Sequence, residues 1–184
     1  STLLHAPHSG YERLAVGTTT VIADTGAPPP PVLSGGAHAG CLSFEMSSGQ
    51  QHIIVNAGVD TYGSDAFRPL ARATAAHSTA TVNDTSQARF TYPPRLAGMI
   101  GAPLLGGPTE VRSQRIDRDG MQGFVASHDA YAGSFGLMHE RELRLNPSGT
   151  VLVGRDRFFR APGRTAPREG RDLVAGGQAR QIVV

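Results

Sequence analysis

The sequence predicts an all-β protein, built as a mostly antiparallel β-sandwich. About nine or ten short segments alternate apolar with polar residues or contain β-branched runs, and no segment supports a long helix. The chain contains 23 glycines and 13 prolines in 184 residues. That share of about a fifth exceeds the usual share of roughly 12% and fits many turns between short strands. We expect one domain over residues 1–184.

The clearest pair of strands is predicted at residues 41–47 and 51–56, which a Ser-Ser-Gly-Gln turn joins. In the first segment Leu42, Phe44 and Met46 alternate with polar residues, and the second segment contains a β-branched run. These patterns predict adjacent antiparallel strands with Leu42 and Phe44 buried. His38 has the same parity as these apolar residues, so its ring would point the same way if the strand extends backwards.

The other elements of the N-terminal half follow from similar patterns. A first hairpin is predicted at residues 12–16 and 18–24, where β-branched residues are frequent. The four prolines at 28–31 cannot donate hydrogen bonds to a sheet and predict an extended connector. A long loop follows, with a short helix at 66–73 and a strand at 79–82.

The C-terminal half contains two further predicted hairpins. The first joins residues 110–116 to 121–127 through an Asp-Gly turn, and the second joins 135–146 to 151–158. Residues 160–180 are rich in arginine, glycine and proline and contain few apolar residues. We therefore expect this last segment to be mobile.

Charge and cysteine usage narrow the class of protein only slightly. All 17 basic residues are arginines, and they give a net charge of +2 against 15 acidic residues. This balance permits an anionic partner, but the arginines are scattered, and we expect no nucleic-acid partner. A single cysteine, Cys41, excludes an internal disulfide, and we interpret it as a buried structural thiol.

The compartment and the natural ends of the protein are left open. No apolar run approaches the roughly 20 residues that a membrane-spanning helix needs, so we expect no membrane span. The chain begins with serine and ends in a strand-like run, which indicates a piece of a longer protein. An export signal would then lie outside the sequence, and both the periplasm and the cytoplasm of a bacterium fit.

Three short motifs carry a family resemblance. They are Gly-Ala-His-Ala-Gly at 36–40, followed by Cys-Leu-Ser-Phe, then Ala-Thr-Ala-Ala-His-Ser-Thr at 73–79, and Ser-His-Asp-Ala-Tyr at 127–131. In this order and spacing the chain resembles the C-terminal β-domain of the heparinase II/III polysaccharide lyases, from about Tyr11 to about Phe158. The resemblance implies a β-sandwich that follows an α/α toroid domain, with an acidic polysaccharide such as a glycosaminoglycan bound between the two.

The resemblance also implies a metal site, and the chain departs from the family pattern at three positions. His38, Asn56 and His77 occupy the positions of the metal ligands, and Asn56 replaces the family's aspartate. Gly40 replaces a second aspartate, and Gly36 replaces a histidine that the family uses in catalysis. Neutral imidazoles with an amide oxygen form a weak zinc site, so zinc is the expected cofactor. The alternative is a pair of structural histidines.

The chemistry that the resemblance implies is β-elimination at a uronate. This reaction needs a base, an acid and groups that neutralise the sugar carboxylate. In the family most of these groups lie on the toroid. Within this chain the candidate catalytic residues are His38, His77, His128 and Tyr131. For His128 and Tyr131 the alternative is a hydrogen-bond network at a strand end.

We therefore expect the β-domain of a lyase that acts on uronate-containing acidic polysaccharide and is inactive without its toroid domain. The alternative function is a non-catalytic structural or glycan-contacting β-sandwich. A cupin-type metalloenzyme is disfavoured because Gly36 breaks the His-x-His pair that such a site needs. A stand-alone carbohydrate-binding module is disfavoured because the chain has no tryptophan and few aromatic residues for stacking on sugars.

Overall fold

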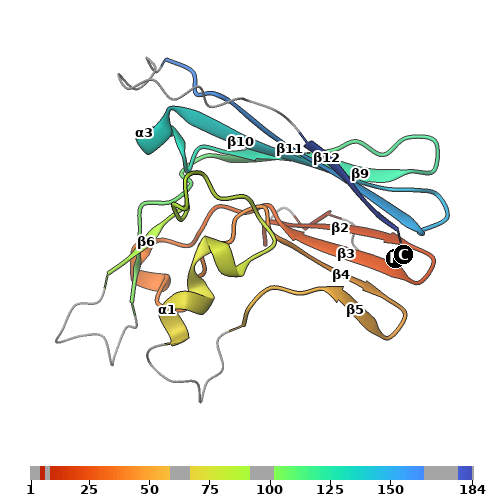
Figure 1. Ribbon diagram of the computed structural model, residues 1–184, viewed down its shortest axis with the longest axis horizontal. Helices are drawn as coiled ribbons and strands as arrows, with labels where there is room; N and C mark the ends of the chain where they lie inside the picture. The colour runs from red at the N-terminus through yellow and green to blue at the C-terminus, as the bar shows by residue number, and fades with distance from the viewer. Residues whose placement is uncertain (1–4, 7–8, 59–66, 92–101, 164–177, 184) are drawn as a thin grey trace.

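Two five-stranded sheets stack face to face in a computed structural model of the chain (Figure 1). The structure describes residues 5–6, 9–58, 67–91, 102–163 and 178–183. Every neighbouring pair of strands in both sheets is antiparallel. The predicted fold class, an all-β antiparallel sandwich, is confirmed.

The first sheet is a meander in which each strand pairs with the next along the chain. Its strands are β1 (His5–Ala6), β2 (Tyr11–Val16), β3 (Thr19–Asp24), β4 (Phe44–Ser48) and β5 (Gln51–Ile54). Both predicted hairpins of this half are therefore confirmed. β4 begins only at Phe44, because Leu42 adopts a left-handed φ of 61° and its N–H donates to the Asp24 carbonyl. The strand predicted at 41–47 therefore starts later than expected, and it does not extend back to His38, which lies in a loop.

The second sheet has the order β12-β11-β10-β9-β8. Its strands are β8 (Val111–Arg115), β9 (Gln122–His128), β10 (Leu137–Leu145), β11 (Val151–Arg160) and β12 (Gln178–Val183). The two predicted hairpins of this half are confirmed. Most of the segment that we expect to be mobile, 160–180, lies outside the described residues, but residues 178–180 belong to β12 and pair with β11.

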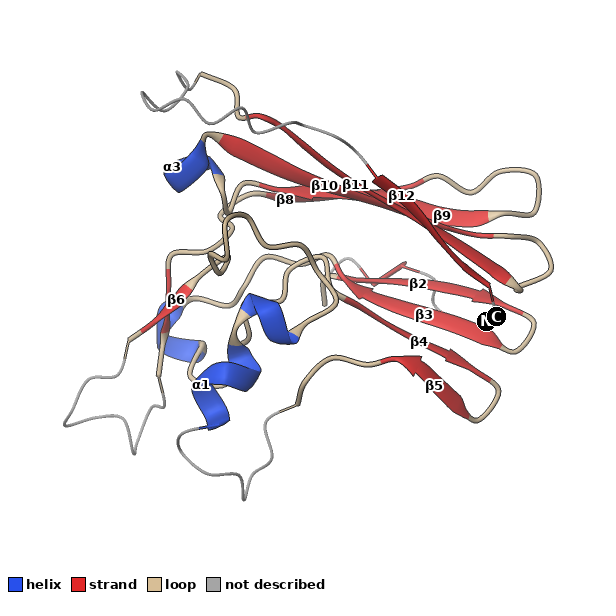
Figure 2. Ribbon diagram, in the orientation of Figure 1, coloured by secondary structure: helices blue, strands red, loops and turns tan. Residues whose placement is uncertain are grey.

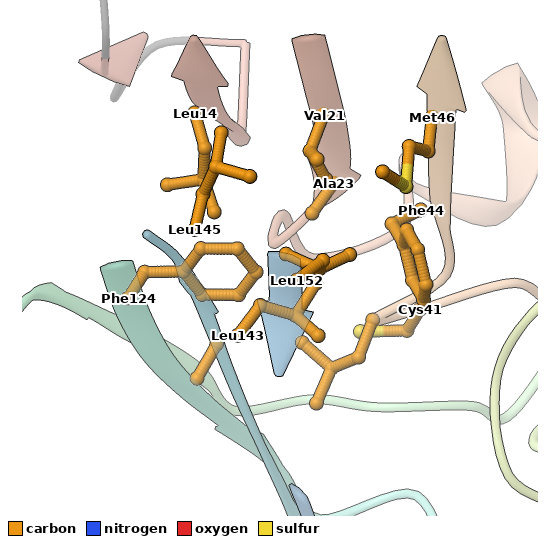
Figure 3. Close-up of a cluster of buried hydrophobic side chains, with 12 residues drawn as sticks. Leu14, Val21, Ala23, Cys41, Phe44, Met46, Phe124, Leu143, Leu145 and Leu152 are labelled. Atoms are coloured by element: carbon orange, nitrogen blue, oxygen red, sulfur yellow. The ribbon is translucent and has the colours of Figure 1, made fainter. Parts of the chain in front are cut away.

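The core fills the space between the two sheets (Figure 3). The alternation of each strand sends every second side chain inward, and most of the inward residues are apolar. Glu12, His128, His139 and Arg141 are buried polar exceptions. The first sheet and the loop before β4 contribute Leu14, Val21, Ala23, Cys41, Leu42, Phe44 and Met46. The second sheet contributes Phe124, Ala126, Leu143, Leu145 and Leu152. Each large side chain buried here contributes about 1.5–3 kcal/mol. The predicted burial of Leu42, Phe44 and Cys41 is confirmed.

Short helices and a two-stranded sheet gather at one end of the sandwich (Figure 2). They are η1 (Pro31–Leu33), α1 (Phe67–Arg72), η2 (Thr74–Ala76), β6 (Arg89–Phe90), β7 (Leu104–Leu105) and α3 (Ala132–Phe135). The predicted short helix is present as α1. Of the helices in the described part of the chain, none has the length and apolar character to cross a bilayer.

The strand predicted at 79–82 is wrong. Val82 makes only an isolated bridge to Thr85, and the two residues between them, Asn83 and Asp84, have φ values of 53° and 55°. Two consecutive left-handed residues form a tight turn, and asparagine and aspartate tolerate that conformation better than most residues do. The β-branched residues before the turn therefore belong to a loop that leads from the His77 segment to β6.

The tip of the β10–β11 hairpin touches the end of β2, which gives a test of how closely the sheets approach. A Cβ on Gly149, where φ is 71°, would lie 2.3 Å from the Val16 carbonyl oxygen. Gly49 in the β4–β5 turn has a φ of 57°, but a Cβ there meets nothing within 4 Å. Gly49→Ala should cost about 1 kcal/mol for its conformation alone, whereas Gly149→Ala should cost about 3 kcal/mol because of the added clash. Urea unfolding measures both, and equal losses would contradict the close approach.

Candidate functional site

The structure brings His38 and His77 into direct contact, although 39 positions separate them. Their Nδ1 and Nε2 atoms lie 2.9 Å apart, and the two rings meet edge to face with centroids 5.0 Å apart. His77 Nδ1 also lies 2.9 Å from the carbonyl oxygen of Ala73. We call this arrangement the histidine pair.

The hydrogen bonds of the histidine pair determine which ring nitrogens carry protons. A carbonyl oxygen only accepts, so His77 Nδ1 carries a proton and donates it to Ala73. In the neutral ring His77 Nε2 is then an acceptor, and His38 Nδ1 donates to it. Burial, His77 and Arg72 lower the pKa of His38 below its usual value, so His38 is neutral at pH 7. Its Nε2 atom therefore holds a lone pair that can accept a proton.

The loop that bears His38 is held by the short helices beneath it. The Arg72 side chain, at the end of α1, donates from Nε to the Ala37 carbonyl at 2.7 Å and from Nη2 to the Ser34 carbonyl at 3.0 Å. Thr74 Oγ1 donates to the Ala39 carbonyl at 2.7 Å. Arg72 is 2% exposed, and its charge is offset by these carbonyls and by the Phe90 ring 4.3 Å below its guanidinium.

Ser78, the residue after His77, connects the histidine pair to the first sheet. Its N–H donates to Asn56 Oδ1 at 2.8 Å, and its hydroxyl exchanges hydrogen bonds with the backbone of Phe44. Asn56 in turn donates from its side chain to the Ser43 hydroxyl and from its backbone to Glu45 Oε1. Asn56 therefore lies in the same cluster as the pair and acts as an acceptor for the backbone.

An arginine from the second sheet reaches across the sandwich to the same loop. Arg141 Nη1 donates to the Leu42 carbonyl at 2.7 Å and also to the Ser78 carbonyl. Its Nε and Nη2 atoms each lie 2.8 Å from one oxygen of Asp156. Burial alone would raise the pKa of Asp156, but hydrogen bonds from His139 and Arg141 outweigh it and hold that pKa below its usual range. We call Arg141, Asp156 and their carbonyl partners the arginine clamp.

His128 lies in a buried chain of hydrogen bonds beside the clamp. The Ala130 N–H donates to His128 Nδ1, so the proton of the neutral ring is on Nε2, 3.1 Å from His139 Nδ1. His139 Nε2 then donates to Asp156 at 2.8 Å. Burial lowers the pKa of His128 to about 3. Tyr131 is 1% exposed, and its hydroxyl donates to the Ala80 carbonyl.

The two glycines that depart from the family pattern have different surroundings. A Cβ on Gly40 would lie 2.8 Å from Cδ2 of His77, so any other residue there would displace the His77 ring. A Cβ on Gly36 would meet nothing within 4 Å. The lack of a side chain at Gly40 therefore allows the His77 ring to occupy its present position. At Gly36, by contrast, there is open space where the resemblance implies a histidine.

The donors at the histidine pair do not fit zinc as they are arranged. Zinc needs the lone pairs of separate nitrogens at about 2.0–2.1 Å, but here the two imidazoles bond to each other and Asn56 Oδ1 accepts from Ser78. Among the described residues, no group of three or more His, Cys, Asp or Glu side chains is arranged to hold a metal ion. We therefore assign no chemical step to a metal.

A pocket of about 710 Å³ lies beside the histidine pair. His38, His77 and Asn56 line one part of it, and Asp24 and Glu45 line the part formed by the first sheet. The described lining includes neither His128 nor Tyr131. The structure thus gathers three of the predicted site residues at one pocket and places the other two in the buried interior.

The family of the chain follows from comparison of its sequence with known families. The family described as "Heparinase II/III-like, C-terminal" matches residues 1–175, so this is a β-sandwich domain related to polysaccharide lyases. The chain belongs to that heparinase II/III-like C-terminal family. It is also 35% identical over 153 residues to FtsZ-localized protein C of Caulobacter vibrioides, which covers 82% of this chain and 26% of that protein.

Two solved structures share the fold. A mutant of the heparan sulfate lyase HepC from Pedobacter heparinus superimposes with a TM-score of 0.61 at 18% identity over 84% of this chain. A heparinase III superimposes with a TM-score of 0.55 at 16% identity over 82% of this chain. The chain spans about a fifth of the length of each of these proteins and about a quarter of the Caulobacter protein.

Sequence reasoning missed the residues that support the site. Arg141 shares the inward parity of His139 and Leu143 in the sequence. A charged side chain on an inward face requires a buried partner, so this parity was a sequence signal for the arginine clamp. Arg72 ends the predicted short helix, but no pattern in the sequence indicates that its side chain is buried and binds the loop of His38. Asp24 and Glu45 lie at strand positions that face outward, and only the fold shows that they border the pocket.

Buried histidines should make the fold less stable as the pH falls below about 6.5. Unfolded His128 binds a proton near pH 6.5, whereas the folded form does so only near its pKa of about 3. Stability should therefore fall by up to about 1.4 kcal/mol for each pH unit below 6.5. His38, whose pKa is also lowered, acts in the same direction.

Asp24 has the opposite effect on the pH dependence of stability, because burial raises its pKa in the folded state to about 6. Its protonation favours the folded state between about pH 6 and 4 and offsets part of the loss. Asp24→Asn should therefore steepen the loss in that window, as measured by urea unfolding at a series of pH values. A wild-type stability that rises as the pH falls from 7 to 6 would contradict a neutral, buried His128.

Proposed function

We propose that this chain is the β-sandwich part of a lyase-type protein that binds a uronate-containing acidic polysaccharide at the pocket beside His38. Cleavage by β-elimination would require groups from a second domain, which the resemblance identifies as an α/α toroid. The observation that most supports the proposal is the histidine pair. Its hydrogen bond to Ala73 leaves His38 Nε2 as a basic atom at an open pocket.

In the proposed reaction a base removes the C5 proton of the uronate. The C–H electron pair forms the new C4–C5 double bond, the C4–O bond breaks, and an acid protonates the departing sugar oxygen. A neutral His38 Nε2 can accept the C5 proton, and a protonated one can supply the proton to the leaving oxygen. The hydrogen bond to His77 holds the ring in one orientation, which such a transfer requires.

The second domain is needed because this chain forms only part of the catalytic apparatus. The sugar carboxylate must be neutralised as charge develops on it, yet no arginine occurs in the described lining of the pocket. The catalytic histidine position of the family is Gly36. We propose structural rather than catalytic roles for His128 and Tyr131, since their side chains are 0% and 1% exposed.

A second candidate function is a non-catalytic domain that contacts glycan or supports a partner domain. It is favoured by the 35% identity to FtsZ-localized protein C, a protein whose name describes where it is found rather than a reaction. Gly36 also favours it, because the position that the family uses for catalysis has no side chain. Both candidates use the same pocket, and they differ in whether His38 transfers a proton.

The 184-residue chain alone should not cleave heparin, heparan sulfate or alginate, so mixing them should give no absorbance from unsaturated uronate. In the natural full-length protein, His38→Ala should lower kcat/KM by about 10²–10⁴-fold, the usual contribution of a general acid or base. His52→Ala, which removes an exposed imidazole on β5, is the matched control and should leave the activity unchanged.

Two results would contradict the proposal. Cleavage by the 184-residue chain alone would remove the need for a second domain. Full activity of the full-length His38→Ala and His77→Ala variants, with circular dichroism spectra like that of the wild type, would establish the non-catalytic role instead.

A further inference from the structure

Arg72 bonds to the loop of His38 on both sides of the histidine. Its side-chain Nε donates to the Ala37 carbonyl at 2.7 Å, and its own backbone carbonyl accepts from the Ala39 N–H at 2.9 Å. One buried residue at the end of α1 therefore holds the residue before His38 and the residue after it. The backbone that carries the imidazole is fixed from a single position in the chain.

The turn that leads into His38 is held by the same side chain. Arg72 Nη2 donates to the Ser34 carbonyl at 3.0 Å, and that carbonyl also accepts from the Ala37 N–H at 2.9 Å. The Phe90 ring packs against the guanidinium, with its centroid 4.3 Å from Arg72 Cζ. The plane of the guanidinium and the direction of its donors are therefore fixed relative to the turn.

The next two residues along the chain support the histidine pair as well. The Ala73 carbonyl lies 2.9 Å from His77 Nδ1 and accepts its proton, and Thr74 Oγ1 donates to the Ala39 carbonyl at 2.7 Å. The segment 72–74 thus contacts one ring of the pair directly and the backbone beside the other. Its position sets how the two imidazoles meet.

These contacts require an arginine and not merely a positive charge. A guanidinium presents its donors in a rigid planar fork, so Nε and Nη2 can reach two carbonyls at once. A lysine donates from a single atom at the end of a flexible chain. It therefore cannot hold the carbonyls of Ala37 and Ser34 in the same geometry. Arg72→Lys keeps the charge and removes the fork.

We propose that Arg72 is a positioning residue for proton transfer at the pocket, one that fixes the place and the tautomer of the His38 ring. This inference rests on the proposed function of His38. Arg72 does not belong to the described lining of the pocket, so it acts through the histidine. A displacement of about 1 Å in a reacting group can cost about 10²-fold in rate. Loss of the fork should therefore lower kcat and leave KM unchanged.

Nitrogen-resolved NMR of the histidine rings in the 184-residue chain tests the positioning. In Arg72→Lys the His38 ring should average between its two tautomers, because its hydrogen bond to His77 is no longer held. His77 should keep its proton on Nδ1, because the Ala73 carbonyl is still present. Arg68→Lys makes the same change at an exposed position of α1 and is the matched control, so its ring spectrum should match the wild type.

Thr74 offers a second pair of variants in which no charge changes. Thr74→Val removes the hydroxyl that holds the Ala39 carbonyl, and the His38 ring should again average between tautomers. Thr74→Ser keeps the hydroxyl and should match the wild type. This pair tests the inference even if Arg72→Lys does not fold.

Kinetics of the natural full-length protein test the consequence for the reaction. Arg72→Lys should lower kcat by about 10²-fold, with a KM within about twofold of the wild type. Arg68→Lys should change neither constant. A role in stability alone would lower the urea midpoint of Arg72→Lys but leave the kcat and the His38 spectrum of the folded variant as in the wild type.

The outcomes separate failure of this inference from failure of the proposed function. If folded Arg72→Lys and Thr74→Val both give the wild-type spectrum of His38, the inference is wrong whatever the activity. If KM rises and kcat does not change, Arg72 acts on binding, and the inference is again wrong. If the His38 spectrum changes and kcat does not, Arg72 positions the ring as proposed, and the proposed proton transfer by His38 is wrong.

Discussion

The buried guanidinium of Arg141 joins the two halves of the sandwich at the point where the site is built. It extends from β10 in the second sheet and donates hydrogen bonds to the carbonyls of Leu42 and Ser78. Leu42 lies in the loop before β4, and Ser78 follows His77. Asp156 balances its charge with two hydrogen bonds. Removing one partner of a buried ion pair costs about 3–5 kcal/mol, and the part-exposed position of Asp156 reduces that figure. The loops of the site depend on this pair because they contain little regular structure of their own.

From that anchor the site follows by a short series of contacts. Ser78 bonds to Asn56, and the residue before it, His77, bonds to His38. The loop of His38 is held separately by Arg72. The result is a neutral imidazole with a defined tautomer beside a pocket, an arrangement that suits proton transfer and does not suit metal binding. The resemblance implies an aspartate at the position of Asn56, so at that position this chain has a neutral amide where a carboxylate is expected.

Much of the fold could be predicted from the sequence, because strand alternation and turn residues are local signals. The pairing of β4 with β5 and the Asp-Gly turn before β9 are examples. The strand predicted at 79–82 failed because β-branched residues also occur in loops, and two left-handed residues end it. The grouping of His38, Asn56 and His77 was available only through the family resemblance, since no local pattern relates such distant positions. The inward parity of Arg141 in β10 is a local signal, but its partners in the clamp depend on which faces of the sheets meet, which no local pattern encodes.

Nitrogen-resolved NMR of the histidine rings tests the central claim that the arginine clamp sets the geometry of the histidine pair. At neutral pH the wild type should show a proton on Nδ1 of both His38 and His77. Asp156→Asn should leave the protein folded and less stable, with His77 averaging between its two tautomers because the Ser78 carbonyl is no longer held. Glu140→Gln, which breaks the more exposed ion pair with Arg157 on the same two strands, is the control and should match the wild type. A wild-type His77 protonated on Nε2, or identical ring spectra for wild type and Asp156→Asn, would contradict the account.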